Sequence, residues 1–136
     1  GVIEQFDTPE NIYKRPATEF VARFIGFENF LELAKKQDGV YTAPDGSEFL
    51  TSMDLDCENF AGTIRPDDIC LADEIQTENV LSGTIGVRTF LGKSYQYEVE
   101  TSAGVLKVNM GTDHVYNEGE KIRLYLPKDK LILVRK

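Results

Sequence analysis

The sequence has few of the side chains that most catalytic and metal centres need. Its 136 residues include one histidine, two cysteines and no tryptophan. A single histidine, His114, argues against a histidine-based triad and against a zinc site with several histidines. The polar, turn-like stretch around His114 instead predicts a surface position. Cys57 and Cys70 lack a CxxC spacing, so we expect free thiols and a reducing compartment.

Basic residues are also in short supply. The chain has 15 Lys and Arg against 23 Asp and Glu, for a net charge of -8. Because proteins gain most of their affinity for duplex nucleic acid by neutralising phosphates with Lys and Arg, we expect no nucleic-acid partner. The net charge is -2 for residues 1–44, -9 for 45–79 and +3 for 80–136. The acidic middle is either a solvated face or a surface that attracts the basic end, within one fold or between two copies.

No apolar run approaches the roughly 20 residues that a membrane-spanning helix needs. The sequence begins on a polar stretch without a basic-then-apolar leader, so we expect neither a spanning segment nor a signal peptide. Hydrophobic residues make up 41% and charged residues 28%, as in ordinary globular domains. The length allows one or two small domains.

The phosphate-binding pattern GxxxxGK[ST] is absent from the sequence. Residues 81–86, LSGTIG, resemble the signature loop of ATP-binding cassettes, but that loop opens a helix, whereas the residues after Gly86 continue a strand pattern. Asp54, Asp56 and Glu58 alternate as in a calcium loop, but the glycine that such a loop needs at its sixth position is missing. We therefore expect no metal site, and nothing in the spacing selects a catalytic pair of carboxylates.

Two short helices are expected at the start of the chain. Thr8 and Thr18 are suitable N-caps, Pro9 suits a first helical position, and Pro16 and Gly26 end the two segments. Apolar residues recur at helical spacing in the second segment: Phe20, Val21, Phe24 and Ile25. Helices this short would be poorly covered alone, so we interpret them as the end of something larger.

The rest of the chain has strand patterns. Turn residues at 38–39, 44–47 and 66–68 separate short strands expected at 30–34, 40–42, 49–50, 60–65 and 69–71. After a polar joint at 72–79, apolar and polar residues alternate in five longer strands, near 83–91, 95–100, 105–108, 121–126 and 131–134. Five such strands predict a small closed or partly open barrel, with the shorter strands packed against it.

Three parts of the sequence resemble one family. Residues 1–29 contain GVIEQ, TPENIY, FVARFIG and Asn29, which resemble the run that ends the nucleotide-binding domain in ATPase subunits of ABC importers. Residues 64–67, IRPD, are similar to the (I/V)RPE element of the same subunits. Residues 90–92 and 95–99, with Gly83, are similar to their transport-associated oligonucleotide-fold (TOBE) repeat.

This resemblance implies an all-β, OB-fold-like small β-barrel architecture with a short helical N-terminal lead-in. Residues 1–26 would be the tail of a nucleotide-binding domain, and 27–136 a regulatory domain with a first strand set at 27–71 and a five-stranded barrel at 80–136. The fragment would not be an enzyme and would hold no cofactor. ATP and Mg²⁺ would bind in the full-length subunit.

The resemblance also implies partners and a place in the cell. The regulatory domain would form a homodimer, and the full-length subunit would dock on membrane permease subunits at the cytoplasmic face of the membrane. The run at residues 90–97 favours ferric-iron or polyamine import, whereas residues 26–29 are similar to the joint of molybdate and tungstate importers. The alternative function is therefore an oxyanion sensor that inhibits transport, with Ser82, Thr84 and Lys93 as candidate ligand-binding residues.

Overall fold

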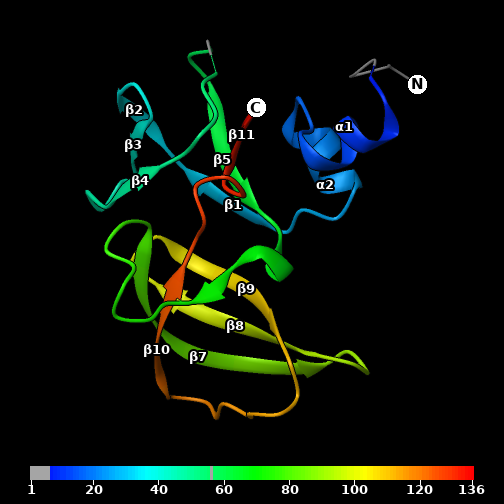
Figure 1. The fold of residues 1–136 in the computed structure, drawn as a ribbon, viewed down its shortest axis with the longest axis vertical. Helices are drawn as coiled ribbons and strands as arrows, with labels where there is room; N and C mark the ends of the chain where they lie inside the picture. The colour runs from blue at the N-terminus through cyan, green and yellow to red at the C-terminus, as the bar shows by residue number, and fades with distance from the viewer. Residues whose placement is uncertain (1–6, 56) are drawn as a thin grey trace.

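The computed structural model describes residues 7–55 and 57–136 (Figure 1). Two short helices, α1 (Pro9–Lys14) and α2 (Glu19–Phe24), lie beside a set of β-strands. The strands are β1 (Asn29–Glu32), β2 (Ala34–Gln37), β3 (Val40–Thr42), β4 (Glu48–Leu50), β5 (Phe60–Ile64), β6 (Cys70–Leu71), β7 (Val80–Phe90), β8 (Tyr95–Thr101), β9 (Gly104–Met110), β10 (Lys121–Tyr125) and β11 (Ile132–Arg135). One 3₁₀ turn, η1 (Pro66–Asp68), precedes β6. The all-β prediction with a helical lead-in is confirmed.

Both helices have the ends that the sequence predicts. The hydroxyl of Thr8 accepts a hydrogen bond from the Asn11 N–H at 3.3 Å, and that of Thr18 from the Val21 N–H at 3.2 Å. These side chains satisfy N–H groups that the first turn leaves unpaired. Gly26 follows the end of α2 with φ +100°, a conformation that a side chain disfavours.

The eleven strands form three antiparallel sheets. The largest has the order β6-β10-β7-β8-β9, and the other two have the orders β1-β5-β11 and β2-β3-β4. In the largest sheet Leu81, Ile85 and Tyr97 are among the inward-facing residues and are buried, as the alternating pattern predicts. The LSGTIG motif lies in β7 and not at the start of a helix, which confirms its interpretation as strand.

The structure corrects two strand assignments. The segment predicted as one strand at 30–34 is divided at Leu33 into β1 and β2, which belong to different sheets. The strand predicted at 131–134 is not the fifth strand of the large sheet: β11 pairs with β5, and β6 takes the fifth place. Alternation within a strand shows which face is buried but not which strand is its neighbour.

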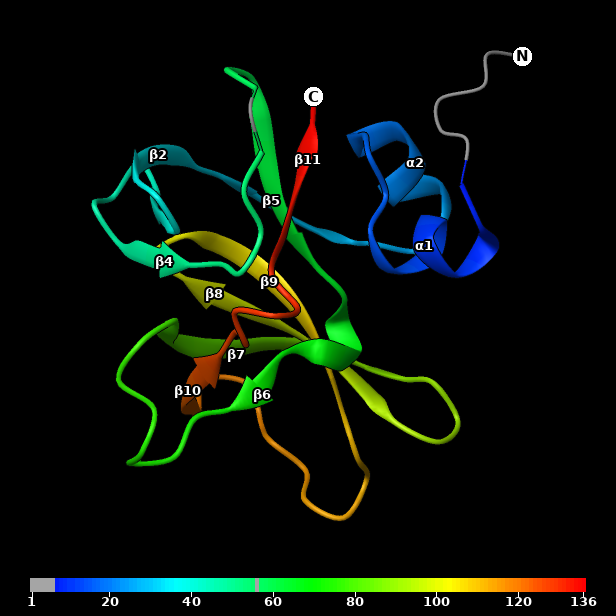
Figure 2. The same cartoon turned by 45° about the horizontal axis from the view of Figure 1, so that its top comes forward.

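Figure 2 shows how the backbones of the three sheets are arranged. One continuous hydrophobic core contains buried side chains from all three sheets. Its largest fully buried side chains include Tyr41, Phe49 and Tyr97. A second, smaller cluster packs Ala22 of α2 and Phe27 against β5 and β11. Helix α2 therefore rests on the β1-β5-β11 sheet, on the face opposite to the main core.

Two asparagine side chains connect the sheets at points where no strand pairs across. Asn29 of β1 donates from Nδ2 to the Lys107 carbonyl at 2.8 Å and accepts from the Lys107 N–H at 2.7 Å. Asn79 pairs in the same way with the Leu50 backbone, at 2.6 Å for both bonds, and also donates to the Leu126 carbonyl at 2.9 Å. A side-chain amide has the donor and acceptor of a peptide group, so each asparagine replaces one missing rung of a ladder.

We predict that Asn79→Ala destabilises the fold by about 3 kcal/mol, because Asn79 is only 4% exposed and its loss leaves backbone groups of Leu50 and Leu126 buried without partners. Asn79 also has φ 57°, which favours asparagine and glycine. Asn79→Gly keeps that conformation and isolates the hydrogen-bond loss. Urea unfolding measures the free energy of unfolding of both Asn79 variants. The control is Asn117→Ala at an exposed position, whose free energy of unfolding should stay within about 0.5 kcal/mol of the wild-type value. Equal stability of Asn79→Ala and the control would contradict the assignment.

Candidate functional site

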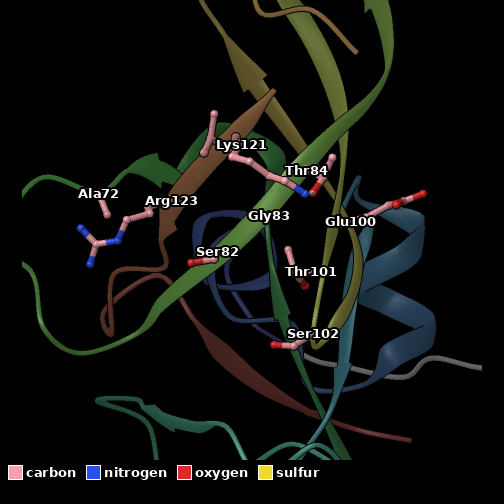
Figure 3. Close-up of a pocket in the computed structure, with 10 residues that line it drawn as sticks. Ala72, Ser82, Gly83, Thr84, Glu100, Thr101, Ser102, Lys121 and Arg123 are labelled. Carbon is pink, nitrogen blue, oxygen red and sulfur yellow. Dashed lines mark hydrogen bonds between the residues drawn. The ribbon is translucent and has the colours of Figure 1, made fainter. Parts of the chain in front are cut away.

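A hollow of about 690 Å³ lies on the large sheet, over β7, β8 and β10 (Figure 3). Its polar lining comes from three strands and the turn after β8: Ser82, Thr84, Glu100, Thr101, Ser102, Lys121 and Arg123. Ser82 and Thr84 share the outer face of β7 because Gly83 between them points inward. An added Cβ on Gly83 would meet Val99 Cγ1 at 2.4 Å, so this strand position requires glycine.

Two cations of β10 reach the same face. Lys121 is the register partner of Thr84, and Arg123 is that of Ser82. The Lys121 ammonium donates a hydrogen bond to the Thr84 hydroxyl at 2.6 Å. Among the described residues neither cation forms an ion pair, although the Glu100 carboxylate also lines the hollow. The Arg123 guanidinium extends towards Ala72 in Figure 3 and donates to the Asp73 carbonyl at 3.5 Å, so Lys121 is the cation at the hydroxyl groups. A lysine beside hydroxyl donors suits a small anion.

The structure brings together two of the three residues that the sequence selected. Ser82 and Thr84 line the hollow, but Lys93 lies in the turn between β7 and β8, outside it. Lys121 and Arg123 take the place expected of Lys93. Sequence reasoning missed them because it showed only that both face away from the core, and the pairing of β10 with β7 was not yet known.

Arg65 forms a second notable site, at the joint between helices and sheet. Its guanidinium lies between two rings, with Cζ 3.8 Å from the Tyr13 ring centroid and 4.2 Å from that of Phe27. Nη2 donates to the Tyr13 carbonyl at 3.1 Å and Nη1 to the Ile25 carbonyl at 3.0 Å. These carbonyls lie at the C-terminal ends of α1 and α2, where a cation is favoured by unpaired acceptors and by the helix dipole. One side chain thus fixes both helices to the end of β5.

A cleft of about 390 Å³ lies beside this joint, lined by Lys14, Arg15, Asp67, Asp68, Asp129 and Lys130 together with the stacked residues. Cations and carboxylates alternate along it. The mixture does not select a ligand of either sign, and the cleft is best described as the seam between the helical lead-in and the sheets.

In the acidic segment at residues 54–58, Asp54 is paired with a lysine. Asp54 accepts a hydrogen bond from Lys35 at 3.2 Å, and this contact lowers the pKa of the Asp54 carboxyl. Hydrogen bonds to Asp38 and then Asp54 raise the pKa of Lys35. Asp56 lies outside the described residues. Within the part of the chain that the structure describes, no group of three potential metal ligands is present.

The curled antiparallel sheets define the class of the protein, a small OB-fold-like β domain. Its fold is similar to the cytoplasmic molybdate-binding protein ModG with molybdate bound, with a TM-score of 0.64 over 80% of this chain and 96% of that one. The sequence identity is 11%, so this likeness concerns the fold alone. Residues 62–134 match the TOBE domain family, and the chain belongs to that family.

Relatives share more of the sequence. The chain is 37% identical to a spermidine/putrescine import ATP-binding protein of Acetivibrio thermocellus over 74% of its length, and 33% identical to one of Pseudomonas aeruginosa over 95%. A third, from Borreliella afzelii, is 32% identical over the whole chain. The chain spans 28%, 37% and 38% of these three relatives, so it matches about a third of their length. In the described residues no helix is long and apolar enough to cross a membrane.

We predict that Arg65→Ala loosens the helical lead-in without unfolding the sheets. Losing two hydrogen bonds from a charged donor and two ring contacts should cost about 2 kcal/mol, which corresponds to roughly thirtyfold faster amide exchange in α1 and α2. Arg65→Lys keeps the charge but loses the planar group that stacks on the rings. Its amide exchange rates in α1 and α2 should lie between those of the wild-type chain and those of Arg65→Ala. Hydrogen exchange read by mass spectrometry measures this, with Arg123→Ala as control. Unchanged exchange in α1 and α2 of Arg65→Ala would contradict the role of the joint.

Proposed function

We propose that this chain is the regulatory part of the ATP-binding subunit of a polyamine importer. The observation that best supports this is the match to the TOBE domain family together with similarity to spermidine/putrescine import ATP-binding proteins over 74% to 100% of the chain. Of the two solutes that the run at residues 90–97 favoured, ferric iron and polyamine, these relatives support polyamine. ATP hydrolysis, with its Mg²⁺, then belongs to parts of such a subunit outside this chain, because the sequence has no phosphate loop.

The proposed mechanism is mechanical. Tyr13, Phe20 and Phe24 of the helical lead-in are exposed, Phe24 by 83%, and offer an apolar surface for an adjoining nucleotide-binding domain. Arg65 holds these helices on the β domain, so a movement of the nucleotide-binding domain would be transmitted to the β domain and not absorbed by a flexible linker. Two such subunits would meet through their β domains beneath permease subunits at the cytoplasmic face of the membrane. The spacing that the β domains impose would then favour or oppose closure of the ATPase domains.

A chimera tests this proposal. Replacing the matching segment of the Pseudomonas aeruginosa relative with this chain should retain spermidine uptake in cells that lack the native protein. The same chimera with Arg65→Ala should lose at least about half of that uptake while keeping its expression level, because the helices are no longer fixed. Radiolabelled spermidine uptake gives the result, and Lys128→Ala, at an exposed lysine outside the hollow and the Arg65 joint, serves as control. A well-expressed, dimer-competent chimera without uptake would count against the polyamine assignment.

A second candidate function is sensing of a small oxyanion in the hollow of the large sheet. It is favoured by Lys121 and Arg123, which face Ser82 and Thr84 without an ion-pair partner in the described residues. In this reading the bound ion, not a polyamine, would shift the balance between two arrangements of the subunits.

Thermal melts of the purified chain separate the two functions. With molybdate, tungstate, sulfate or phosphate at 100 times its dissociation constant, a sensor should gain about 2.7 kcal/mol, a rise of several degrees in Tm. Lys121→Met should abolish that rise, and Lys93→Met, which lies outside the hollow, should retain it. No rise with any of the four anions would exclude the sensor.

A further inference from the structure

Two ordered surface patches lie at the two ends of strand β7. The first, here the hairpin tip, is the turn between β7 and β8 and its flanks, residues 87–94. The second, here the acidic loop, is residues 71–79, which end where β7 begins. Figures 1 and 2 show them on opposite sides of the large sheet. An eleven-residue strand spans roughly 35 Å, so the two patches of one chain cannot touch.

The hairpin tip is apolar and basic. Val87, Phe90 and Leu91 are exposed, Phe90 by 61%. The turn is fixed by a hydrogen bond from the Leu91 N–H to the Ser94 carbonyl at 2.8 Å and by Gly92 at φ +95°. Residues 86–97 include Arg88 and Lys93 but no Asp or Glu, in a chain of net charge -8. Arg88 already donates to the Tyr116 carbonyl at 3.1 Å, which leaves Lys93 as the cation of the turn itself.

The acidic loop combines exposed apolar side chains with carboxylates. Leu71 is exposed, and Ile75 is 81% exposed. The loop is ordered by hydrogen bonds: the Ile75 N–H donates to the Asp73 carboxylate and the Asp73 N–H to the Gln76 side chain, both at 2.8 Å. From β10, the Arg123 guanidinium also donates to the Asp73 carbonyl, at 3.5 Å. Residues 71–79 include Asp73, Glu74 and Glu78 and no base. The loop therefore holds an exposed isoleucine in a segment that carries three carboxylates.

We propose that the hairpin tip of one chain docks on the acidic loop of a second copy of the same chain. Phe90 and Leu91 would pack on Ile75 and Leu71, with Lys93 next to the carboxylates of the loop. Apolar contact supplies affinity, and the opposite charges supply register and orientation. The charge of each patch differs in sign from the other, so neither pairs favourably with itself.

A two-fold axis lets both contacts form at once. Two copies placed with their β7 strands antiparallel bring each hairpin tip to the acidic loop of the other copy, so the interface is isologous and closes at a dimer. A parallel arrangement satisfies one contact only and leaves the other pair of patches exposed. The inference rests on the proposed function in one respect, since it names the surface through which the β domains of two subunits would meet.

The test measures the association of the purified chain by sedimentation velocity over a range of concentrations. The wild-type chain should sediment as a monomer–dimer equilibrium. Lys93→Glu should raise the dimer dissociation constant about tenfold, because it places like charges next to each other. Phe90→Ser should raise it about thirtyfold, because it removes a central apolar contact. Lys128→Glu and Phe20→Ser, which change an exposed lysine and an exposed phenylalanine elsewhere, should not alter it.

A charge exchange makes the test specific to this pairing. Glu74→Lys combined with Glu78→Lys, which leaves the loop-ordering Asp73 in place, should weaken self-association on its own, and adding Lys93→Glu to the same chain should restore it to within about threefold of wild type.

The outcomes separate the two proposals. A dimer weakened by Phe20→Ser but not by Phe90→Ser, a monomer at every concentration, or species larger than a dimer would overturn this interface. None of these results bears on uptake by the chimera, which tests the proposed function by itself.

Discussion

The architecture depends on hydrogen bonds between asparagine side chains and strand backbones. The three sheets have no strand in common, so backbone ladders alone do not hold them together. Asn29 supplies the missing rung between the β1-β5-β11 sheet and the edge strand β9, and Asn79 does the same between β4 and the end of β10. Both side chains are buried, and the apolar core contains side chains from all three of the sheets that they connect. A buried amide that matches a peptide group fixes register as well as distance, which apolar packing alone does less well.

The same framework positions the features related to function. Since Asn79 fixes the start of β7, it also fixes the strand that presents Ser82 and Thr84, and it ends the acidic loop whose isoleucine points outward. At the other side of the molecule, Arg65 connects the helical lead-in to β5 through carbonyls at the ends of both helices. The protein thus has a stiff β domain with surfaces at its two ends and one defined mechanical connection to the helices. Such a construction suits a module that transmits changes of position between its two sides.

Local features of the fold were predictable because their causes lie within a few residues. Thr8 and Thr18 cap helices through their own hydroxyl groups, Gly26 adopts a positive φ, and the alternation at 95–100 determines which side chains enter the core. Long-range pairing was not predictable in the same way. Nothing near Leu131 distinguishes a fifth strand of the large sheet from a partner of β5, and two-residue β6 is too short to show a period. The same limit applies to the site predicted from Ser82, Thr84 and Lys93. The first two line the hollow and Lys93 does not, because local sequence does not show which strands pair beside β7.

By itself the sequence determined the class of fold, the helix ends, the buried face of the alternating strands β8 and β10, the uneven distribution of charge and the resemblance to importer subunits. Each of these follows from local steric preferences, from the two-residue period of a strand, or directly from the order of the amino acids. Only the tertiary structure decided that Lys121 and Arg123 face Ser82 and Thr84, that Arg65 lies between Tyr13 and Phe27, and that Asn79 connects two sheets. These contacts join residues 29 to 52 positions apart. At such separations chain entropy opposes every pairing alike, and the energy of the whole core selects which one forms.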